Sequence, residues 1–152
     1  MKNNFEIEKV TENNFHDFLY LINKLAEYEK KNPPDIYAQK RLMDDYLIKN
    51  QKYYAYLGRI DNNFIGYIFY YFTYSSYKAL PILHIEDLLI LKKFRKKGFG
   101  QKLFDFCIIK AKEKGCTHVE WTVYNWNTAA IKFYEKNMAT CLDKFYYQLK
   151  IS

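Results

Sequence analysis

A basic segment that contains two glycines carries the clearest chemical signal in this sequence. It reads Arg95-Lys96-Lys97-Gly98-Phe99-Gly100, and it joins a predicted strand to a predicted helix. Backbone N–H groups at a helix start are unpaired and carry the positive end of the helix dipole. Because glycines permit close approach, this pattern predicts a cradle for phosphate oxygens, with Lys96 and Lys97 adding charge. A simple turn is the competing interpretation of the two glycines, and neither the P-loop pattern nor the fingerprint G-x-G-x-x-G occurs.

Acidic residues near this segment suggest a second chemical element. Glu86 lies in an otherwise apolar predicted strand, where an unpaired buried charge is costly, so we interpret it as a functional residue. Asp87 follows it directly. Glu29 lies at the end of the first predicted helix, and a solvated surface charge is its competing interpretation.

The elements that must position these residues follow from hydrophobic periodicity and turn residues. Their predicted order is β-α-α-β-β-β-α-β-α-β. The predicted strands cover residues 5–10, 53–60, 64–73, 82–91, 118–124 and 138–149. The predicted helices cover residues 11–31, 42–47, 100–115 and 128–136. An antiparallel hairpin region followed by two β-to-α units requires a mixed sheet, so the predicted fold class is α/β, with a central mixed sheet of about six strands and about four flanking helices.

Local signals set several of these boundaries. Thr11 is the predicted N-cap of the first helix, with Asn14 at the capping-box position. Pro33-Pro34 prevents that helix from continuing, and Gly115 is a plausible C-cap of the third helix. Asp61-Asn62-Asn63 is typical of a hairpin turn.

Composition limits the class of protein. The chain has 152 residues, 49% of them hydrophobic, which fits one compact domain spanning residues 1–152. Its net charge of +7 comes mostly from scattered lysines rather than a basic stripe, so no nucleic-acid partner is expected. Three cysteines without a C-x-x-C pair favour a reducing, cytoplasmic location. The sequence has no apolar signal core or membrane-spanning stretch, and its three histidines lack metal-ligand spacing, so neither a membrane partner nor a metal is expected.

Five segments in order resemble the GNAT (Gcn5-related) N-acetyltransferase family. Residues 95–100 resemble its R/Q-x-x-G-x-G/A pyrophosphate loop, and residues 124–135 resemble its N-x-x-A-x-x-F-Y segment. Residues 69–75 and 85–88 are similar to the YYFTY and LED signatures of the diamine (spermidine/spermine) acetyltransferase branch, whose first helix is matched by residues 25–29. The resemblance spans nearly the whole chain and implies a GNAT-like acyl-CoA N-acyltransferase fold.

The resemblance also implies how acetyl-CoA binds. In this family a bulge in the fourth strand splays it from the fifth, and acetyl-CoA lies in the gap. Backbone groups of the fourth strand contact the acetyl and pantetheine portion, the basic loop contacts the pyrophosphate, and the last helix contributes further contacts. The implied cofactor-binding residues are Leu88, Leu89, Ile90, Arg95, Lys96, Lys97, Gly98, Phe99, Gly100, Gln101, Asn127 and Ala130.

Two catalytic roles follow from the resemblance and from the chemistry of acetyl transfer. Tyr134 lies seven residues after Asn127, two helical turns along the same face, and is the expected general acid for the leaving thiolate. An alkylammonium has a pKa near 10.4, so a substrate amine arrives charged and must lose a proton before attack. Glu86 is the expected acceptor of this proton, directly or through water. Tyr28, Glu29, Glu86 and Asp87 are the expected substrate-binding residues.

The sequence leaves the acceptor open. The resemblance favours a polyamine or diamine, while a lysine-like amine such as thialysine, or a protein amino group, is the alternative. The sequence lacks the RNA-recognition motif, which argues against a nucleic-acid binder. Tyr134 and Asn127 argue against a CoA-binding protein without catalysis. The resemblance further implies a homodimer. One departure from the family pattern is Met138 in place of a glycine, and we expect Asn137 to take the left-handed turn instead.

Overall fold

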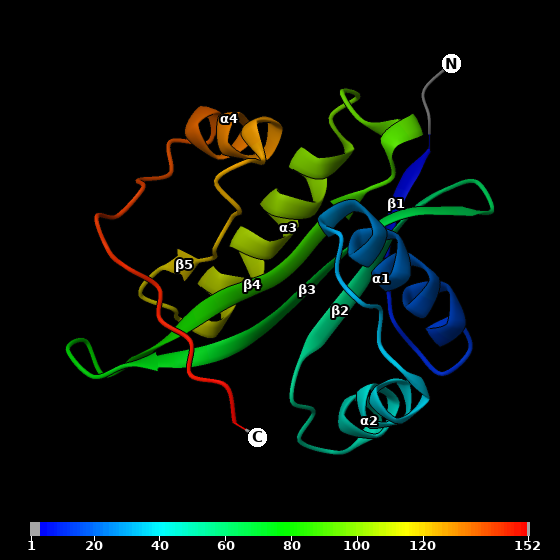
Figure 1. Cartoon of the computed structure of the whole chain (residues 1–152), viewed down its shortest axis with the longest axis horizontal. Coiled ribbons are helices and arrows are strands. Elements are labelled where there is room, and N and C mark those ends of the chain that lie inside the picture. The colour runs from blue at the N-terminus through cyan, green and yellow to red at the C-terminus, as the bar shows by residue number, and fades with distance from the viewer. Residues whose placement is uncertain (1–3, 152) are drawn as a thin grey trace. The chain divides into compact units, whose positions relative to one another are not determined.

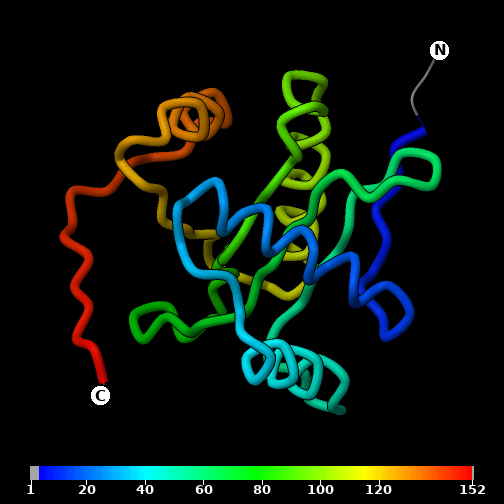
Figure 2. Tube along the Cα trace, turned by 45° about the vertical axis from the view of Figure 1, so that its right-hand side comes forward, coloured from blue at the N-terminus to red at the C-terminus, as the bar shows by residue number. Residues whose placement is uncertain are grey.

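A computed structural model describes residues 4–151, and their contacts divide the chain into one unit that ends at Trp121 and a second that begins at Thr122. The labelled elements can be followed in Figure 1, and the path of the chain in Figure 2. The first unit contains β1 (Phe5–Lys9), α1 (Phe15–Glu29), α2 (Ile36–Leu47), β2 (Tyr54–Ile60), β3 (Asn63–Ser75), β4 (Leu80–Ile90), a 3-10 turn (Lys92–Phe94), α3 (Phe99–Lys114) and β5 (Val119–Glu120). The second unit contains α4 (Thr128–Lys136).

The five strands form one sheet in the order β1-β2-β3-β4-β5. The pairs β1-β2, β2-β3 and β3-β4 are antiparallel, and β5 runs parallel to β4. The predicted mixed α/β architecture is therefore confirmed. The predicted hairpin is present as well, because β2 and β3 are joined by a turn in which Asp61 has a φ of 52°.

Helices cover both faces of this sheet. On one face α1 and α2 bury Phe15, Phe18 and Tyr46 against Tyr67 and Leu89 of the sheet. Side chains alternate between faces along a strand, so Tyr56 points to the opposite face from Ala55 and Leu57. There the centroid of its ring lies 4.6 Å from that of the Phe106 ring of α3.

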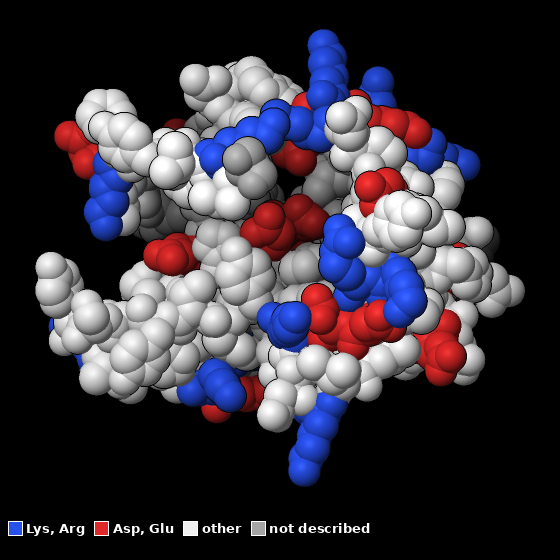
Figure 3. Space-filling view, turned by 60° about the horizontal axis from the view of Figure 1, so that its bottom comes forward, with Lys and Arg blue, Asp and Glu red and all other residues white. Residues whose placement is uncertain are grey.

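On the surface view of Figure 3, acidic and basic side chains are interspersed.

The start of α1 differs from the prediction. The helix begins at Phe15, and Asn14 rather than Thr11 holds the N-cap position. The Asn14 side chain accepts a hydrogen bond from the Thr11 N–H (2.7 Å) and donates one to the Lys9 carbonyl (3.1 Å). Asn14 therefore closes the turn between β1 and α1, and this turn occupies the residues that we expected to be the first helical turn.

The second unit confirms its predicted helix but not its predicted strand. α4 covers residues 128–136, as expected. Residues 138–149 contain no strand, and Phe145 and Tyr147 are each 87% exposed. A strand needs a hydrogen-bonded neighbour as well as a suitable pattern of residues, and this segment pairs with no strand of the described residues. The sheet therefore has five strands rather than about six.

Two smaller corrections concern the same region. β5 is limited to residues 119–120 instead of 118–124, because its pairing with β4 covers two residues. The left-handed residue after α4 is Met138, with a φ of 64°, whereas Asn137 has a φ of −86°.

Candidate active site

A β-bulge in β4 determines where the predicted acidic residues lie. Phe69 of β3 is opposite Asp87, but the next residue, Tyr70, is opposite Ile85, so Glu86 is an extra residue in β4. Side chains normally alternate between the two faces of a sheet, and a bulge interrupts this alternation. Glu86 shares a face with His84 before the bulge, and Asp87 shares a face with Leu89 after it. Both acids therefore lie on the face covered by α1.

Two tyrosines of β3 hold these two carboxylates. The Tyr67 hydroxyl donates a hydrogen bond to Asp87 Oδ2 (3.0 Å), and the Tyr71 hydroxyl donates one to Glu86 Oε2 (3.2 Å). Tyr67 is fully buried, so its hydroxyl needs this partner. The two tyrosines lie four residues apart on one face of β3, and each reaches one of the two acids on β4.

Glu29 completes an acidic cluster, which we define as Glu29, Glu86 and Asp87. Burial is the largest cause that raises the pKa of Asp87, to about 7; the hydrogen bond from Tyr67 lowers it, and the negative charges of Glu86 and Glu29 raise it further. Burial also raises the pKa of Glu29, with Lys31 opposing this effect and Glu86 adding to it. Carboxylates whose negative charges raise the pKa of a neighbouring acid favour a bound cation, because an arriving positive charge relieves both burial and repulsion.

The structure corrects the reason for which Glu86 was selected. Its side chain is 50% exposed and has polar partners, so it is not an unpaired buried charge. Asp87 is the more buried acid, and the burial effect that we attributed to Glu86 acts on Asp87 instead. The bulge explains why Glu86 is the more exposed of the two acids, since Glu86 is the extra residue and has no partner opposite it in β3.

Beyond the bulge, one edge of β4 presents its backbone groups away from β3. The Leu91 N–H bonds the Ile65 carbonyl of β3 (2.8 Å). In an antiparallel pair alternate residues bond the partner strand, so Leu89 and Asp87 also face β3, while Leu88 and Ile90 face the other edge. β5 pairs with β4 only at Leu83 and His84. Within the described residues, no strand therefore covers this edge beside Leu88 and Ile90, which were both predicted to bind the cofactor.

The N-terminus of α3 has the properties of an anion site. Gly98 holds the N-cap position with a φ of 85°, and the first turn has neither a capping side chain nor an acidic residue. A Cβ added to Gly98 would meet nothing within 4 Å, and one added to Gly100 would make only an ordinary contact of 3.6 Å with Ile90. The φ of 85° already favours glycine at position 98, whereas neither a left-handed backbone nor crowding within the protein requires glycine at position 100. With exposed Lys96 and Lys97 beside them, the two residues fit a loop that the phosphates of acetyl-CoA approach closely.

Arg95 is directed toward α1 rather than along the loop. Its Nε donates to the Ile90 carbonyl (2.7 Å), and its guanidinium lies 4.8 Å from the centre of the Tyr28 ring. These contacts connect two predicted site residues, Tyr28 and Arg95, to the outward-facing edge of β4. A cavity of about 390 Å³ adjoins them and is lined by Lys24, Glu27, Tyr28, Leu89, Leu91, Lys92 and Arg95.

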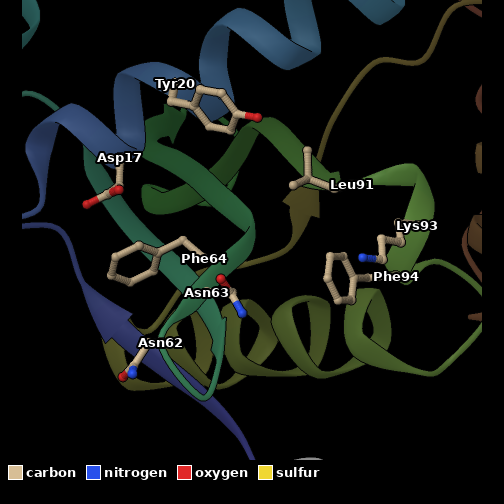
Figure 4. Close-up of a pocket in the computed structure, with 8 residues that line it drawn as sticks. All are labelled: Asp17, Tyr20, Asn62, Asn63, Phe64, Leu91, Lys93 and Phe94. Atoms are coloured by element: carbon tan, nitrogen blue, oxygen red, sulfur yellow. The ribbon is translucent and has the colours of Figure 1, made fainter.

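A second cavity, of about 560 Å³, lies near the other end of α1 (Figure 4). Asp17 on its rim is about 18 Å along the helix from Glu29, at 1.5 Å per residue. None of Glu29, Glu86 and Asp87 lines this cavity, although Leu91 borders both cavities. It is lined by Asp17, Tyr20, Asn62, Asn63, Phe64, Leu91, Lys93 and Phe94.

The remaining predicted residues lie in the second unit, on α4. Asn127 is the N-cap of this helix, and its side-chain oxygen accepts a hydrogen bond from the Ala130 N–H (3.3 Å). Tyr134 lies two turns further along the helix, and its ring packs edge-on against that of Phe133 (5.4 Å between centroids).

Sequence reasoning missed three residues that contact the acidic cluster or its neighbours. Tyr67, Tyr71 and His84 hold the carboxylates, and Tyr71 and His84 are opposite each other across β3 and β4. The available signal was the period of two along β3, which places Tyr67 and Tyr71 on one face.

Comparison with known proteins identifies the family of this chain. Residues 17–139 match the acetyltransferase (GNAT) family. A thialysine N-epsilon-acetyltransferase of Caenorhabditis elegans is 32% identical over 132 residues, covering 87% of this chain and 81% of that protein. The Bos taurus thialysine N-epsilon-acetyltransferase is 28% identical over 137 residues, covering 85% and 80%.

The fold is shared with solved structures. A possible acetyltransferase from Clostridium difficile 630 superimposes with a TM-score of 0.83 at 17% identity, covering 97% of this chain and 98% of that one. The family match extends over most of the chain, and its relatives transfer acetyl groups. The chain therefore belongs to the GNAT acetyltransferase family and is an acetyl-transferring enzyme.

Proposed function

We propose that this enzyme transfers the acetyl group of acetyl-CoA to a primary amine of a small, positively charged substrate, a polyamine or diamine. The observation that carries the proposal is the bulge in β4. On one side it gathers Glu86 and Asp87 with Glu29, and directly after it Leu88 and Ile90 turn their backbone groups outward. A cation site therefore adjoins a strand edge that is able to hold an acyl group.

Residues of two segments would hold acetyl-CoA, which supplies the activated acetyl thioester. Leu88 and Ile90 would contact its acetyl and pantetheine portion through their outward-facing backbone groups, and Leu89, whose backbone faces β3, through the cavity that it lines. The pyrophosphate would lie at the start of α3, where uncapped N–H groups and nearby lysines favour an anion. We assign this second role to Arg95, Lys96, Lys97, Gly98, Phe99, Gly100 and Gln101, and an additional contact from α4 to Asn127 and Ala130.

The acidic cluster and one tyrosine would carry the proton transfers. Asp87, Glu29 and Tyr28 hold the substrate ammonium, and Glu86 accepts the proton that the nitrogen must lose before it attacks the carbonyl carbon. Tyr134 donates a proton to the departing sulfur. The reaction converts an ammonium and a thioester into an amide and a thiol, so one proton is released in each turnover.

A lysine-like amine is a second candidate acceptor. The relatives from Caenorhabditis elegans and Bos taurus are thialysine N-epsilon-acetyltransferases and match most of this chain. Thialysine and diamines both present a terminal ammonium on a flexible apolar chain, which suits the acidic cluster equally. Protein amino groups are the remaining alternative, and acidic clusters of this kind attract lysine side chains as well.

Thiol release provides the direct test. Purified enzyme is mixed with acetyl-CoA and separately with spermidine, putrescine, thialysine, lysine and a lysine-containing peptide, and free thiol is followed over time. We expect at least one small amine to accelerate release, and the ranking of kcat/KM identifies the acceptor class. If only the peptide is acetylated, or if no amine accelerates release, the proposal is wrong.

We also propose that the enzyme acts as a single-domain, cytoplasmic homodimer without a metal, nucleic-acid or membrane partner. The unpaired cysteines and scattered lysines support this setting. No helix among residues 4–151 is long and apolar enough to cross a membrane. Analytical ultracentrifugation tests the dimer, and an assay with EDTA tests the independence from metal.

A further inference from the structure

Three side chains form a row across the sheet beside Glu86. Tyr71 of β3 is in register with His84 of β4, and His84 is in register with Glu120 of β5. Because neighbours in register point to the same face, all three lie on the face that carries Glu86. The Tyr71 and His84 rings are 5.0 Å apart between centroids, which restricts the orientation of the imidazole.

His84 has a carboxylate oxygen within 4.0 Å of each of its ring nitrogens. Its Nε2 lies 3.5 Å from Glu86 Oε2, and its Nδ1 lies 4.0 Å from Glu120 Oε1. Glu120 is itself held, because its Oε2 lies 3.1 Å from Nε2 of His118. The side chain of His84 is 21% exposed, whereas those of Glu86 and Glu120 are 50% and 46% exposed. The imidazole is therefore more enclosed than either carboxylate.

The contacts on Glu86 meet at one atom. Tyr71 and His84 both approach Oε2, from neighbouring strands. A half-exposed glutamate has several accessible rotamers, and two contacts on one oxygen select the rotamer in which the other oxygen, Oε1, points away from both. A carboxylate held in this way can meet a substrate nitrogen in a fixed geometry.

We propose that His84 is a positioning residue for acetyl transfer, which fixes the carboxylate of Glu86, and that Glu120 in turn orients the His84 ring. This inference rests on the proposed function, in which Glu86 accepts the proton of the amine. The arrangement follows a pattern common in active sites, in which a group that transfers a proton is oriented by a second residue and that residue by a third.

Three substitutions of His84 separate this role from simple packing. His84→Gln places an N–H group near the position of Nε2 and keeps the contact with Glu86. His84→Asn places one near the position of Nδ1 and keeps only the contact with Glu120. His84→Phe retains the ring stacking on Tyr71 and removes both polar contacts. Each variant is assayed by thiol release for kcat and for the KM of both substrates, and its thermal midpoint is recorded.

We expect His84→Gln to retain at least about half of the wild-type kcat/KM for the amine. His84→Asn and His84→Phe should lose about tenfold, a typical effect of removing an orienting partner. The loss should fall on kcat, while the KM for acetyl-CoA stays unchanged. Glu120→Gln should lower kcat in the wild-type background but have no further effect in the His84→Phe background.

Two results would overturn the inference. One is an activity of His84→Asn equal to that of His84→Gln; the other is a loss in His84→Gln as large as in His84→Phe. The comparison of Gln with Asn decides the question even if the Phe variant fails to fold. Glu86→Gln serves as the reference: if it leaves turnover intact, the proposed role of Glu86 is wrong, whereas if only the His84 variants remain fully active, the proposed function stands and the positioning role does not.

Discussion

Replacement of Asp87 by asparagine should stabilise the enzyme while reducing its activity. Asn has the shape of Asp and can still accept the hydrogen bond from Tyr67, but it carries no charge. In the folded protein burial and the neighbouring carboxylates raise the pKa of Asp87 from 3.8 to about 7. The folded state therefore binds this proton more tightly than the unfolded state does, and the stability contributed by the protonated carboxyl is lost as the pH rises from about 4 to about 7.

The size of the effect follows from this difference in pKa. A difference of about three pKa units corresponds to about 4 kcal/mol at a pH above both values. Asp87 is only partly buried, and the solvent that reaches it screens part of this energy. Asp87→Asn should thus raise the free energy of unfolding by about 1–3 kcal/mol at pH 8 and have little effect at pH 4.

Urea unfolding of both proteins at pH 4, 6 and 8 measures this difference. Asp44→Asn is the control, because Asp44 is 58% exposed on α2 and its substitution should change stability by less than about 0.5 kcal/mol at any of these pH values. In the thiol-release assay Asp87→Asn should raise the KM for the amine. For the same reason the KM of the wild-type enzyme should fall as the pH rises through about 7 and Asp87 gains its charge. An Asp87→Asn protein that is equally destabilised at pH 4 and pH 8 would refute the argument.

Four glycine and tyrosine substitutions test the rest of the site. Gly98→Ala should cost about 1–2 kcal/mol, because the residue has a φ of 85°, and should also weaken acetyl-CoA binding in calorimetry. Gly100→Ala should leave the thermal midpoint unchanged, since its Cβ meets only an ordinary contact, yet weaken acetyl-CoA binding; unchanged binding would exclude close approach at this position. Tyr134→Phe should lower kcat by about 100-fold at constant KM for acetyl-CoA, and an equal change in both would indicate packing. Gly66→Ala should destabilise the fold by about 1–3 kcal/mol in urea unfolding, because its Cβ would lie 2.3 Å from the Leu89 carbonyl oxygen; a variant as stable as wild type would contradict this.

Elements with local start and stop signals could be predicted from the sequence. Gly115 ends α3 with a φ of 76°, as predicted, and α4 begins at the predicted residue, Thr128, where the Asn127 side chain caps it. These signals act within a few residues of the chain, so the sequence alone reveals them. The predicted strand at residues 138–149 has no such local basis, since a strand depends on a partner that the sequence does not identify.

The candidate site was predictable in its residue types but not in its geometry. Glu29, Glu86 and Asp87 were selected together, and the raised pKa of Asp87, to which the charges of Glu86 and Glu29 contribute, agrees with a common location. The family resemblance implied a bulge in the fourth strand, but the apolar run around Glu86 does not show which residue is inserted, because a bulge is defined by the register with β3. For that reason sequence reasoning assigned burial to the wrong acid, and missed His84 as a neighbour of Glu86.

One inserted residue in β4 accounts for two properties of the site. Before the bulge the Leu83 N–H points to β5, where it bonds the His118 carbonyl (3.2 Å), so in a regular strand residues 85, 87 and 89 would face the same edge. The extra residue Glu86 shifts this alternation, and Leu88 and Ile90 face that edge instead. The same shift keeps Asp87 on the α1 face together with Glu86, whereas regular alternation would send it toward the apolar residues beneath α3. The bulge therefore creates the acidic cluster and the outward-facing backbone beside it in a single step, which ties the position of the cation site to that of the strand edge proposed to hold the acetyl group.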